Sequence, residues 1–263
     1  MHGVLCFLVI LSVILCATSS ESSESYVPQK QDLHVVTVVT DPRHPHVQWL
    51  KQSAAKHGIP VHVLVSSKPI GHAAGGHFGQ KITLTRAFLN SNAIPPDDLV
   101  MFVDGYDVVL NGSKREISRR FHAIARGRDV AVFAAELFCW PDRDLEDEYA
   151  QRRPTNSAFK YLNSGTYMGR ASTLKRILNE NFEGLDDTAD DQRVFTSVFL
   201  RTDDIVLDHA TAIFLAVCGA EPHLEELKGR WRNALTGTDP LVYHGNGCGM
   251  DFWKLRIVPS VIS

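Results

Sequence analysis

Leu99-Val-Met-Phe-Val-Asp-Gly-Tyr-Asp-Val-Val-Leu110 is an apolar run that leads directly into two acidic residues. Its first five residues are apolar, which predicts a buried strand. Asp104 and Asp107 would repel each other when ionised, and a hard divalent cation, which prefers oxygen ligands, would remove that repulsion. Their spacing places them on opposite faces of a straight strand, so they converge only if the chain turns at Gly105. The alternative is an exposed turn with two solvated acids.

The composition is that of an ordinary globular protein. The chain has 263 residues, of which 44% are hydrophobic and 22% charged. That length is typical of one large α/β domain or two small ones. The formal net charge of −3 offers no electrostatic attraction for nucleic acid or for an anionic membrane. We therefore expect no nucleic-acid partner.

The N-terminal segment differs from the rest of the chain. Val4 to Leu15 is almost wholly apolar and is followed by the small residues Ala17 to Ser20, which predicts a secretory signal peptide over residues 1–20. The alternative is a membrane anchor, but this stretch is shorter than the about 20 residues that a bilayer requires. No other segment is apolar enough to span a membrane. Residues 21–32 are expected to form a flexible leader, and the protein is expected in the endoplasmic reticulum lumen or secreted.

Cysteine usage and a glycosylation sequon agree with that compartment. Two of the five cysteines lie in the predicted signal, and the remaining three are Cys139, Cys218 and Cys248. Three cysteines can form one internal disulfide, and the sequence does not say which pair forms it. The absence of a Cys-x-x-Cys spacing argues against a structural zinc site. Asn111-Gly-Ser113 is a sequon that has meaning only in a secretory compartment.

Strands and helices alternate along the chain. Runs of β-branched and apolar residues predict strands at 33–40, 59–66, 99–103, 129–135, 161–169, 205–207, 213–217 and before the turn at 244–247. Helical spacing predicts helices at 46–57, 81–89, 113–126, 171–181 and up to residue 200. Ser113 with Glu116 three residues later predicts a capping box. No composition break divides residues 33–255, which predicts one α/β domain with a mostly parallel sheet.

Candidate ligand-binding residues follow strands. In mostly parallel sheets, ligands bind beyond the carboxyl ends of the strands, where Asp104, Asp107 and His244 are all expected. One histidine nitrogen beside two carboxylates is compatible with Mn²⁺, and a cation held in this way can bind a diphosphate and stabilise it as a leaving group. The alternative for His244 is an ordinary surface histidine, because the chain has 12 histidines. The glycine-rich loop Gly71–Gly79 is either a surface loop or a lid, and it lacks the spacing of known dinucleotide and phosphate loops.

Six short motifs carry a family resemblance. In chain order they are Phe102-Val-Asp-Gly-Tyr-Asp-Val-Val-Leu110, Phe138-Cys-Trp-Pro141, Tyr161-Leu-Asn-Ser-Gly165, Asp190-Asp-Gln192, Leu207-Asp-His209 and Val242-Tyr-His-Gly-Asn-Gly247. Together they resemble the glycosyltransferase domain of the procollagen-lysine hydroxylase/glycosyltransferase family. The resemblance covers about residues 33–255. It implies a single-domain α/β GT-A fold over residues 33–263, a UDP-sugar donor and Mn²⁺.

The resemblance also implies roles for individual residues. Asp104, Asp107 and His244 would be the metal ligands, and Tyr106 would stack on the uracil. Lys81 would meet the charge of the phosphate or the sugar. The remaining residues implied at the nucleotide sugar are Gly75, Gly76, Asn163, Gly245 and Asn246. The alternatives are a core tyrosine at Tyr106 and ordinary turn formers at the two asparagines.

Three further residues are implied at the reacting groups. Asp190 and Asp191 resemble an acidic pair near the transferred sugar, although acids are also common at helix N-termini. Trp140 resembles an aromatic residue on the acceptor side, and its alternative is packing beneath a proline loop. With Lys81, these residues are the predicted catalytic set.

The resemblance implies an enzyme that moves a hexose from a UDP-sugar to a protein-linked acceptor. The expected reaction adds glucose to galactosyl-hydroxylysine of collagen-like chains, with retention of the anomeric configuration. Alternatives are galactosyl transfer to hydroxylysine and a non-catalytic module that binds sugar or collagen. A haloacid-dehalogenase phosphatase would need acids at i and i+2, whereas these are at i and i+3. Because the family's hydroxylase domain would follow Ser263, no lysyl hydroxylase activity is expected, and the oligomeric state is left open.

Overall fold

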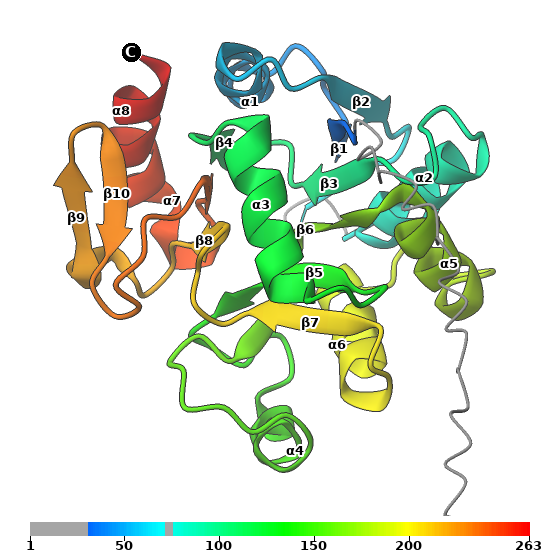
Figure 1. Cartoon of the computed structure of the whole chain (residues 1–263). Coiled ribbons are helices and arrows are strands. Elements are labelled where there is room, and N and C mark those ends of the chain that lie inside the picture. The colour runs from blue at the N-terminus through cyan, green and yellow to red at the C-terminus, as the bar shows by residue number, and fades with distance from the viewer. Residues whose placement is uncertain (1–30, 72–75) are drawn as a thin grey trace, which may run out of the picture. The chain divides into compact units, whose positions relative to one another are not determined.

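The computed structural model describes residues 31–71 and 76–263 (Figure 1). The predicted signal peptide, residues 21–30 of the leader and Gly75 lie outside the described residues. The apolar run that precedes Asp104 forms β3 (Leu99–Val103), and all five of its residues are buried. It lies inside a six-stranded sheet with the order β2-β1-β3-β6-β5-β7. The other strands of this sheet are β1 (Leu33–Val39), β2 (Val61–Val65), β5 (Ala131–Glu136), β6 (Tyr161–Arg170) and β7 (Ile205–Asp208).

The central sheet is mixed, and most of its pairings are parallel. β1 is parallel to β2 and β3, and β5 is parallel to β7. β6 runs antiparallel to both of its neighbours, β3 and β5. β6 is one continuous strand, although it contains the two glycines Gly165 and Gly169. A Cβ at Gly165 would lie 2.1 Å from His244 Cε1, whereas a Cβ at Gly169 would lie 3.2 Å from Leu174 Cδ2, so Gly165 permits close packing and neither glycine ends the strand.

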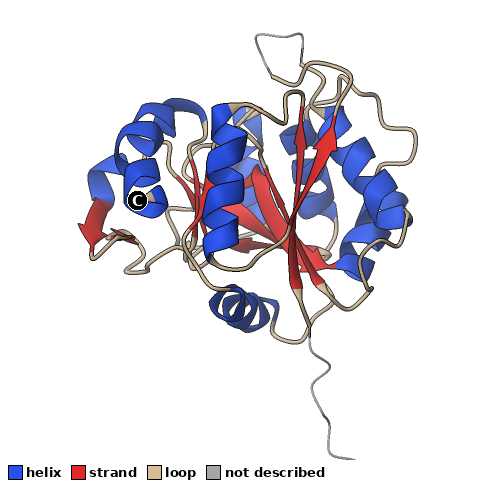
Figure 2. Cartoon of the chain, turned by 90° about the horizontal axis from the view of Figure 1, so that it is seen from above, coloured by secondary structure: helices blue, strands red, loops and turns tan. Residues whose placement is uncertain are grey.

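Helices cover both faces of the central sheet (Figure 2). The helices of the described chain are α1 (Pro45–Lys56), α2 (Gly79–Asn90), α3 (Lys114–Ala125), α4 (Glu146–Arg152), α5 (Ala171–Asn181), α6 (Asp191–Arg201), α7 (Met250–Phe252) and α8 (Val258–Ile262). Val100 and Phe102 of β3 pack into one core with residues of α2, α5 and α6. Their neighbours Leu99, Met101 and Val103 pack into a second core with residues of α1 and α3. The period-two alternation of a strand therefore supplies two cores from one apolar run.

After the acidic turn, the chain enters a second sheet, which has three strands. Its order is β4-β11-β8, formed by β4 (Val108–Leu110), β11 (Val242–His244) and β8 (Phe214–Ala216). β11 is antiparallel to β4 and parallel to β8. This arrangement joins the acidic turn near residue 104 to the histidine near residue 244, because β4 begins directly after Asp107.

Two C-terminal features were not predicted from the sequence. The first is the hairpin of β9 (Leu224–Leu227) and β10 (Arg230–Asn233), which lies beside α7 and α8 in Figure 1. The second is the helical segment from residue 250 to 262, which contains a π-helical turn at Trp253–Ile257. Trp231 of β10 is buried and joins the two, since its indole Nε1 donates to Ser260 Oγ at 2.9 Å. β9 is hard to predict from the sequence because two of its four residues are charged and all of its side chains are half-buried or exposed.

The sequon of Asn111 lies against this hairpin. The Asn111 side-chain Nδ2 donates to the carbonyl of Gly229, in the turn between β9 and β10, at 2.8 Å. The nitrogen that would carry a glycan is therefore hydrogen-bonded in the folded chain.

None of the helices in the described part of the chain is long and apolar enough to cross a membrane.

The start of α3 tests one local prediction from the sequence. The Ser113 side chain caps the helix by accepting from the backbone N–H of Glu116 at 3.2 Å, as expected. The second half of the predicted capping box is wrong, because the Glu116 carboxylate binds Arg120 and Arg230. Two guanidinium partners outweigh the neutral backbone donor that a capping box offers.

We expect Ser113→Ala to lower the free energy of unfolding by about 1 kcal/mol, because it removes one N-cap hydrogen bond. Urea denaturation of the purified chain measures this loss. Ser118→Ala, in the middle of the same helix, is the control and should be neutral or slightly stabilising, because Ala has the higher helix propensity. Equal stability of Ser113→Ala and the unmodified chain would contradict the assignment of the cap.

Candidate active site

The predicted metal ligands converge in the structure. Asp104, Asp107 and His244 each offer a ligand atom, and these atoms all lie within 4.8 Å of one another. His244 Nε2 is 3.3 Å from Asp107 Oδ2 and 3.7 Å from Asp104 Oδ2. The pairing of β4 with β11 brings them together, because His244 lies opposite Val108, the residue after Asp107. The backbone N–H of Gly245 also donates to the carbonyl of Asp107 at 2.7 Å.

Gly105 permits this turn for a different reason from the one expected. Its backbone is not in the left-handed region that favours glycine. A Cβ at this position would instead lie 2.2 Å from Val39 Cγ1, so the end of β1 leaves no room for a side chain. Gly105 is required because the acidic turn packs directly on β1.

The His244 ring is held by residues of β6. Its Nδ1 is 3.0 Å from Asn163 Oδ1, an oxygen that also accepts the backbone N–H of Gly165 at 3.1 Å. An amide oxygen can only accept, so the Nδ1 of His244 carries the proton, and its Nε2 faces the two carboxylates. Gly165 allows the close approach, because a Cβ there would lie 2.1 Å from His244 Cε1. Asn163, predicted at the sugar hydroxyls, thus positions the histidine.

Lys81 lies among the carboxylates. Its Nζ is 2.7 Å from Asp104 Oδ1 and 3.4 Å from Asp191 Oδ2. Burial alone would lower the pKa of Lys81, but the two carboxylates outweigh it and hold that pKa above its ordinary value. Lys81 is therefore charged, and one ammonium group faces three carboxylates, those of Asp104, Asp107 and Asp191. The cluster keeps an excess of negative charge that a divalent cation would balance.

The same burial and charges shift the ligands themselves. Burial raises the pKa of Asp104. Burial acts in the same direction on Asp107, but the charge and hydrogen bond of His244 outweigh it and lower the pKa of Asp107. Burial would lower the pKa of His244, and the two neighbouring carboxylates raise it instead. The donor set of two carboxylate oxygens and one imidazole nitrogen matches a divalent transition metal such as Mn²⁺.

A cavity of about 580 Å³ opens beside this cluster, within the size range of small-molecule sites. Its lining comprises Phe78, Lys81, Asp104, Asp107, Glu136, Phe138, Trp140, Arg143, Asn163, Ser164, Gly165, Asp190, Asp191, Gln192, Cys218, His244, Asn246 and Gly247. Most predicted site residues are in this set. Phe138 and Trp140 are each about half exposed, at 50% and 51%. They give the cavity an aromatic wall.

Three predicted nucleotide residues lie outside that lining among the described residues. Tyr106 holds the acidic turn against β1, because its hydroxyl accepts the backbone N–H groups of Thr40 and Asp41 at 2.8 and 2.9 Å. Gly245 packs on Trp253, whose Cγ would lie 2.6 Å from a Cβ. Gly76 has a positive φ of 71°. Stacking of Tyr106 on uracil and nucleotide contacts of both glycines stay predictions.

The predicted acidic pair divides into two environments. The Asp190 side chain caps α6 by accepting the backbone N–H of Arg193 at 2.9 Å, which is the structural alternative considered for it. Asp191 Oδ2 accepts the hydroxyl of Ser164 at 2.9 Å and faces Lys81. Asp191 is thus bonded within the charged cluster, whereas Asp190 caps the helix at the cavity wall.

Glu136 is a cavity residue that the sequence analysis missed. It ends β5, and its two oxygens accept from Gln192 Nε2 at 2.7 Å and from Asn246 Nδ2 at 3.0 Å. Burial raises its pKa to about 7, and the hydrogen bonds of Gln192 and Asn163 limit the rise. The signal was present in the sequence, because Glu136 follows the apolar run Ala131–Ala135 just as Asp104 follows β3.

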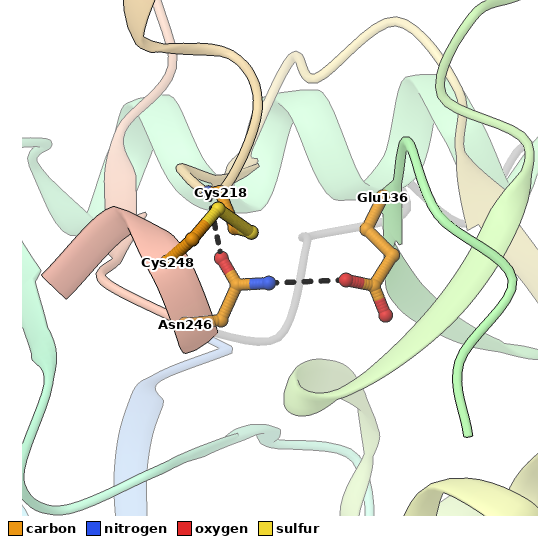
Figure 3. Close-up of a disulfide and its surroundings, with 4 residues drawn as sticks. All are labelled: Glu136, Cys218, Asn246 and Cys248. Atoms are coloured by element: carbon orange, nitrogen blue, oxygen red, sulfur yellow. Dashed lines mark hydrogen bonds between the residues drawn. A yellow bond between two sulfur atoms is a disulfide. The ribbon is translucent and has the colours of Figure 1, made fainter.

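The cysteines left open by the sequence are resolved. Cys218 and Cys248 form a disulfide, with Cα atoms 4.9 Å apart, whereas Cys139 is a buried free thiol. Asn246 lies between this disulfide and Glu136 (Figure 3). Its Oδ1 accepts the backbone N–H of Cys218 at 3.1 Å while its Nδ2 donates to Glu136. Asn246, predicted to contact the donor, therefore also cross-links two walls of the cavity.

Comparison with known families decides the identity of this domain. The family model described as the PLOD GT domain matches residues 29–252. The chain belongs to the PLOD GT domain family. The predicted glycosyltransferase family is thereby confirmed.

Relatives of this PLOD GT domain are longer proteins. The multifunctional procollagen lysine hydroxylase and glycosyltransferase LH3 of Homo sapiens is 30% identical over 258 residues, which cover 92% of this chain and 34% of the relative. A multifunctional procollagen lysine hydroxylase and glycosyltransferase of Caenorhabditis elegans is 31% identical over 262 residues, which cover 93% of this chain and 33% of the relative. The chain thus spans about a third of the length of these curated relatives.

A solved structure confirms the fold. The crystal structure of a glycosyltransferase involved in the glycosylation of the major capsid of PBCV-1 superposes with a TM-score of 0.51. The match covers 85% of this chain and 99% of that structure at 13% identity. The predicted α/β glycosyltransferase fold of the PLOD GT domain is therefore correct.

Gly165→Ala tests the geometry around His244. The new Cβ would overlap the imidazole and displace Nε2 from the carboxylates, so we expect Mn²⁺ affinity to fall by about 10- to 100-fold. Isothermal titration calorimetry measures the affinity. Gly169→Ala on the same strand is the matched control, because a Cβ there first meets a Leu174 side-chain atom at 3.2 Å. Unchanged Mn²⁺ affinity of Gly165→Ala would contradict the assigned ligand.

Glu136 predicts a pH dependence of stability. Between the unfolded pKa of 4.5 and the folded value of about 7, only the folded state keeps the proton, so the free energy of unfolding falls as pH rises. The loss over this window is on the order of 3 kcal/mol. Urea denaturation at pH 5 and pH 8 should therefore show a smaller pH-dependent loss in Glu136→Gln than in the unmodified chain. Equal losses in both proteins would show that Glu136 does not titrate in this way.

Proposed function

We propose that this domain transfers a hexose from a UDP-sugar to a protein-linked hydroxyl group, with Mn²⁺ held by Asp104, Asp107 and His244. The observation that carries the proposal is the convergence of three ligand atoms within 4.8 Å beside a cavity of about 580 Å³. Membership of the PLOD GT domain family supports the glycosyl transfer. The excess of carboxylates over ammonium groups around Lys81 supports a cationic cofactor.

The residues of the cluster divide the work of binding the donor. A bound divalent cation would balance the charge that develops on the departing diphosphate. Lys81 adds a fixed positive charge at the same place, and Asp104 and Asp191 hold its ammonium group in position. We also propose that Tyr106 stacks on the uracil and that Gly75, Gly76 and Gly245 contact the nucleotide sugar.

The acceptor would enter on the aromatic side of the cavity. Trp140 and Phe138 are exposed there, and aromatic faces suit the apolar faces of sugar rings. The names of the human and worm relatives include procollagen lysine hydroxylase and glycosyltransferase. We therefore propose glucose transfer to galactosyl-hydroxylysine of collagen-like chains, with galactose transfer to hydroxylysine as the alternative. Asp190 and Asp191 line the cavity and are the proposed catalytic carboxylates.

We also propose that the protein works in the secretory pathway. The Cys218–Cys248 disulfide supports this compartment, because disulfides persist in oxidising environments and are rare in the cytosol. The signal peptide predicted for residues 1–20 is in agreement. Cleavage near Ala17 to Ser20 in a secreting host, read by N-terminal sequencing, tests this proposal directly.

Asp107→Asn tests the proposed reaction. With a panel of UDP-sugars, Mn²⁺ and a hydroxylysine-containing collagen peptide, we expect the unmodified chain to add one hexose, detected by mass. Asp107→Asn should lower the rate by at least about 100-fold, because it removes a carboxylate from the cation site.

Asp251→Asn is the matched control, since Asp251 is exposed and does not line the cavity. It should retain full activity. If the unmodified chain neither transfers nor hydrolyses any UDP-sugar, the non-catalytic alternative replaces the proposal.

A further inference from the structure

The Cys218–Cys248 disulfide lies just beyond the point where two strands of the second sheet separate. β8 and β11 are hydrogen-bonded as parallel neighbours, and their last link runs from the N–H of Val217 to the carbonyl of His244 at 2.9 Å. Cys218 follows this link directly, and Cys248 lies in the 3-10 helix Gly247–Gly249. The disulfide therefore restrains the segment that extends past His244, which the strand pairing alone does not reach.

That segment forms part of the cavity. Cys218, Asn246 and Gly247 are in the lining, and Asn246 connects the disulfide to Glu136 (Figure 3). The backbone N–H of Cys218 donates to Asn246 Oδ1 at 3.1 Å, and Asn246 Nδ2 donates to Glu136 Oε2 at 3.0 Å. The amide is thus held between a disulfide-linked backbone and a buried carboxylate.

The hydrogen bonds continue from Glu136 to the aromatic wall. Gln192 Nε2 donates to Glu136 Oε1 and to the carbonyl of Trp140, both at 2.7 Å. An unbroken series of contacts therefore runs from Cys218 through Asn246, Glu136 and Gln192 to Trp140. Such a network fixes the relative positions of its members more strongly than isolated pairs would.

The metal ligands have supports that do not pass through the disulfide. The β8–β11 pairing holds His244 and ends before the disulfide. Asn163 also holds the His244 ring, although it hydrogen-bonds to Glu136 as well. Asp107 is held by the N–H of Gly245. Loss of the disulfide should therefore affect the wall that leads to Trp140 more than it affects the cation site.

We propose that the Cys218–Cys248 disulfide is a positioning element for the acceptor side of the cavity, acting through Asn246 and Glu136. This inference rests on the proposed function, since it concerns binding of the acceptor substrate. Cys248 is exposed and Cys218 half-buried, so a soluble reductant reaches the bond. An added dithiol supplies two electrons and two protons, which leaves two thiols on the protein and one disulfide in the reagent.

The test compares the unmodified chain with the double variant Cys218→Ser/Cys248→Ser. We expect the KM for the collagen-peptide acceptor to rise about tenfold in the variant, because displacement of the wall removes contacts that bind the acceptor. The affinities for Mn²⁺ and UDP, measured by calorimetry, should change less than about twofold. Dithiothreitol should reproduce the acceptor effect in the unmodified chain and have no further effect on the double variant.

Two controls separate positioning from general destabilisation. Phe121→Ala removes a buried side chain of α3, a helix that contributes no residue to the cavity lining, and so lowers stability elsewhere. All proteins are assayed at a temperature where circular dichroism shows them folded. An equal rise of the acceptor KM in Phe121→Ala, or equal losses of acceptor and Mn²⁺ affinity in the double variant, would overturn the proposal.

Hydrogen exchange decides the inference even if the proposed reaction fails. The backbone N–H of residue 218 should have a lower protection factor in the double variant, because its acceptor, Asn246, loses the restraint of the disulfide and keeps only that of Glu136. If the unmodified chain shows no transfer but this exchange quickens, the proposed function is wrong and the positioning of Asn246 stands. Unchanged exchange with an unchanged acceptor KM would refute the role of the disulfide.

Discussion

This site depends on balancing the charges of its buried carboxylate, ammonium and imidazole groups. Asp104 and Asp191 both contact Lys81, and Asp107 contacts His244, in a buried cluster where water screens the repulsion of the carboxylates poorly. Lys81 compensates one of these charges, and a protonated His244 can compensate another. A divalent cation between the ligands would replace the need for that proton. The local charge thus links the fold to the proposed chemistry, because a bound cation would offset the excess of carboxylates.

The fold meets this constraint by packing backbones closely. β3 is fully buried, and Asp104 follows its carboxyl end. The pairing of β4 with β11 brings His244 to the same place. Gly105 and Gly165 are both glycines because the next element leaves no space for a Cβ. A rigid sheet end, and not a flexible loop, therefore fixes the candidate ligands.

Much of this could be predicted from the sequence, because strand ends and apolar runs are local signals. The three metal-ligand candidates were predictable since each lies beside the end of an apolar run, but their convergence depends on the antiparallel pairing of β4 with β11 in the second sheet. The hairpin β9–β10 was not, because its charged residues show no apolar face. The pairing of Cys218 with Cys248 depends on two strands that meet only in the folded chain. The role of Asn163 as a partner of His244 likewise depends on tertiary contact.

Direct location of the cation tests the central claim best. Crystals of the domain grown with Mn²⁺ and UDP, measured at a wavelength where manganese scatters anomalously, would show where the metal binds. We predict one strong anomalous peak in contact with Asp104, Asp107 and His244 Nε2, with the diphosphate on the open side of the metal. Bound UDP with no manganese at these residues, or a peak held by other side chains, would contradict it.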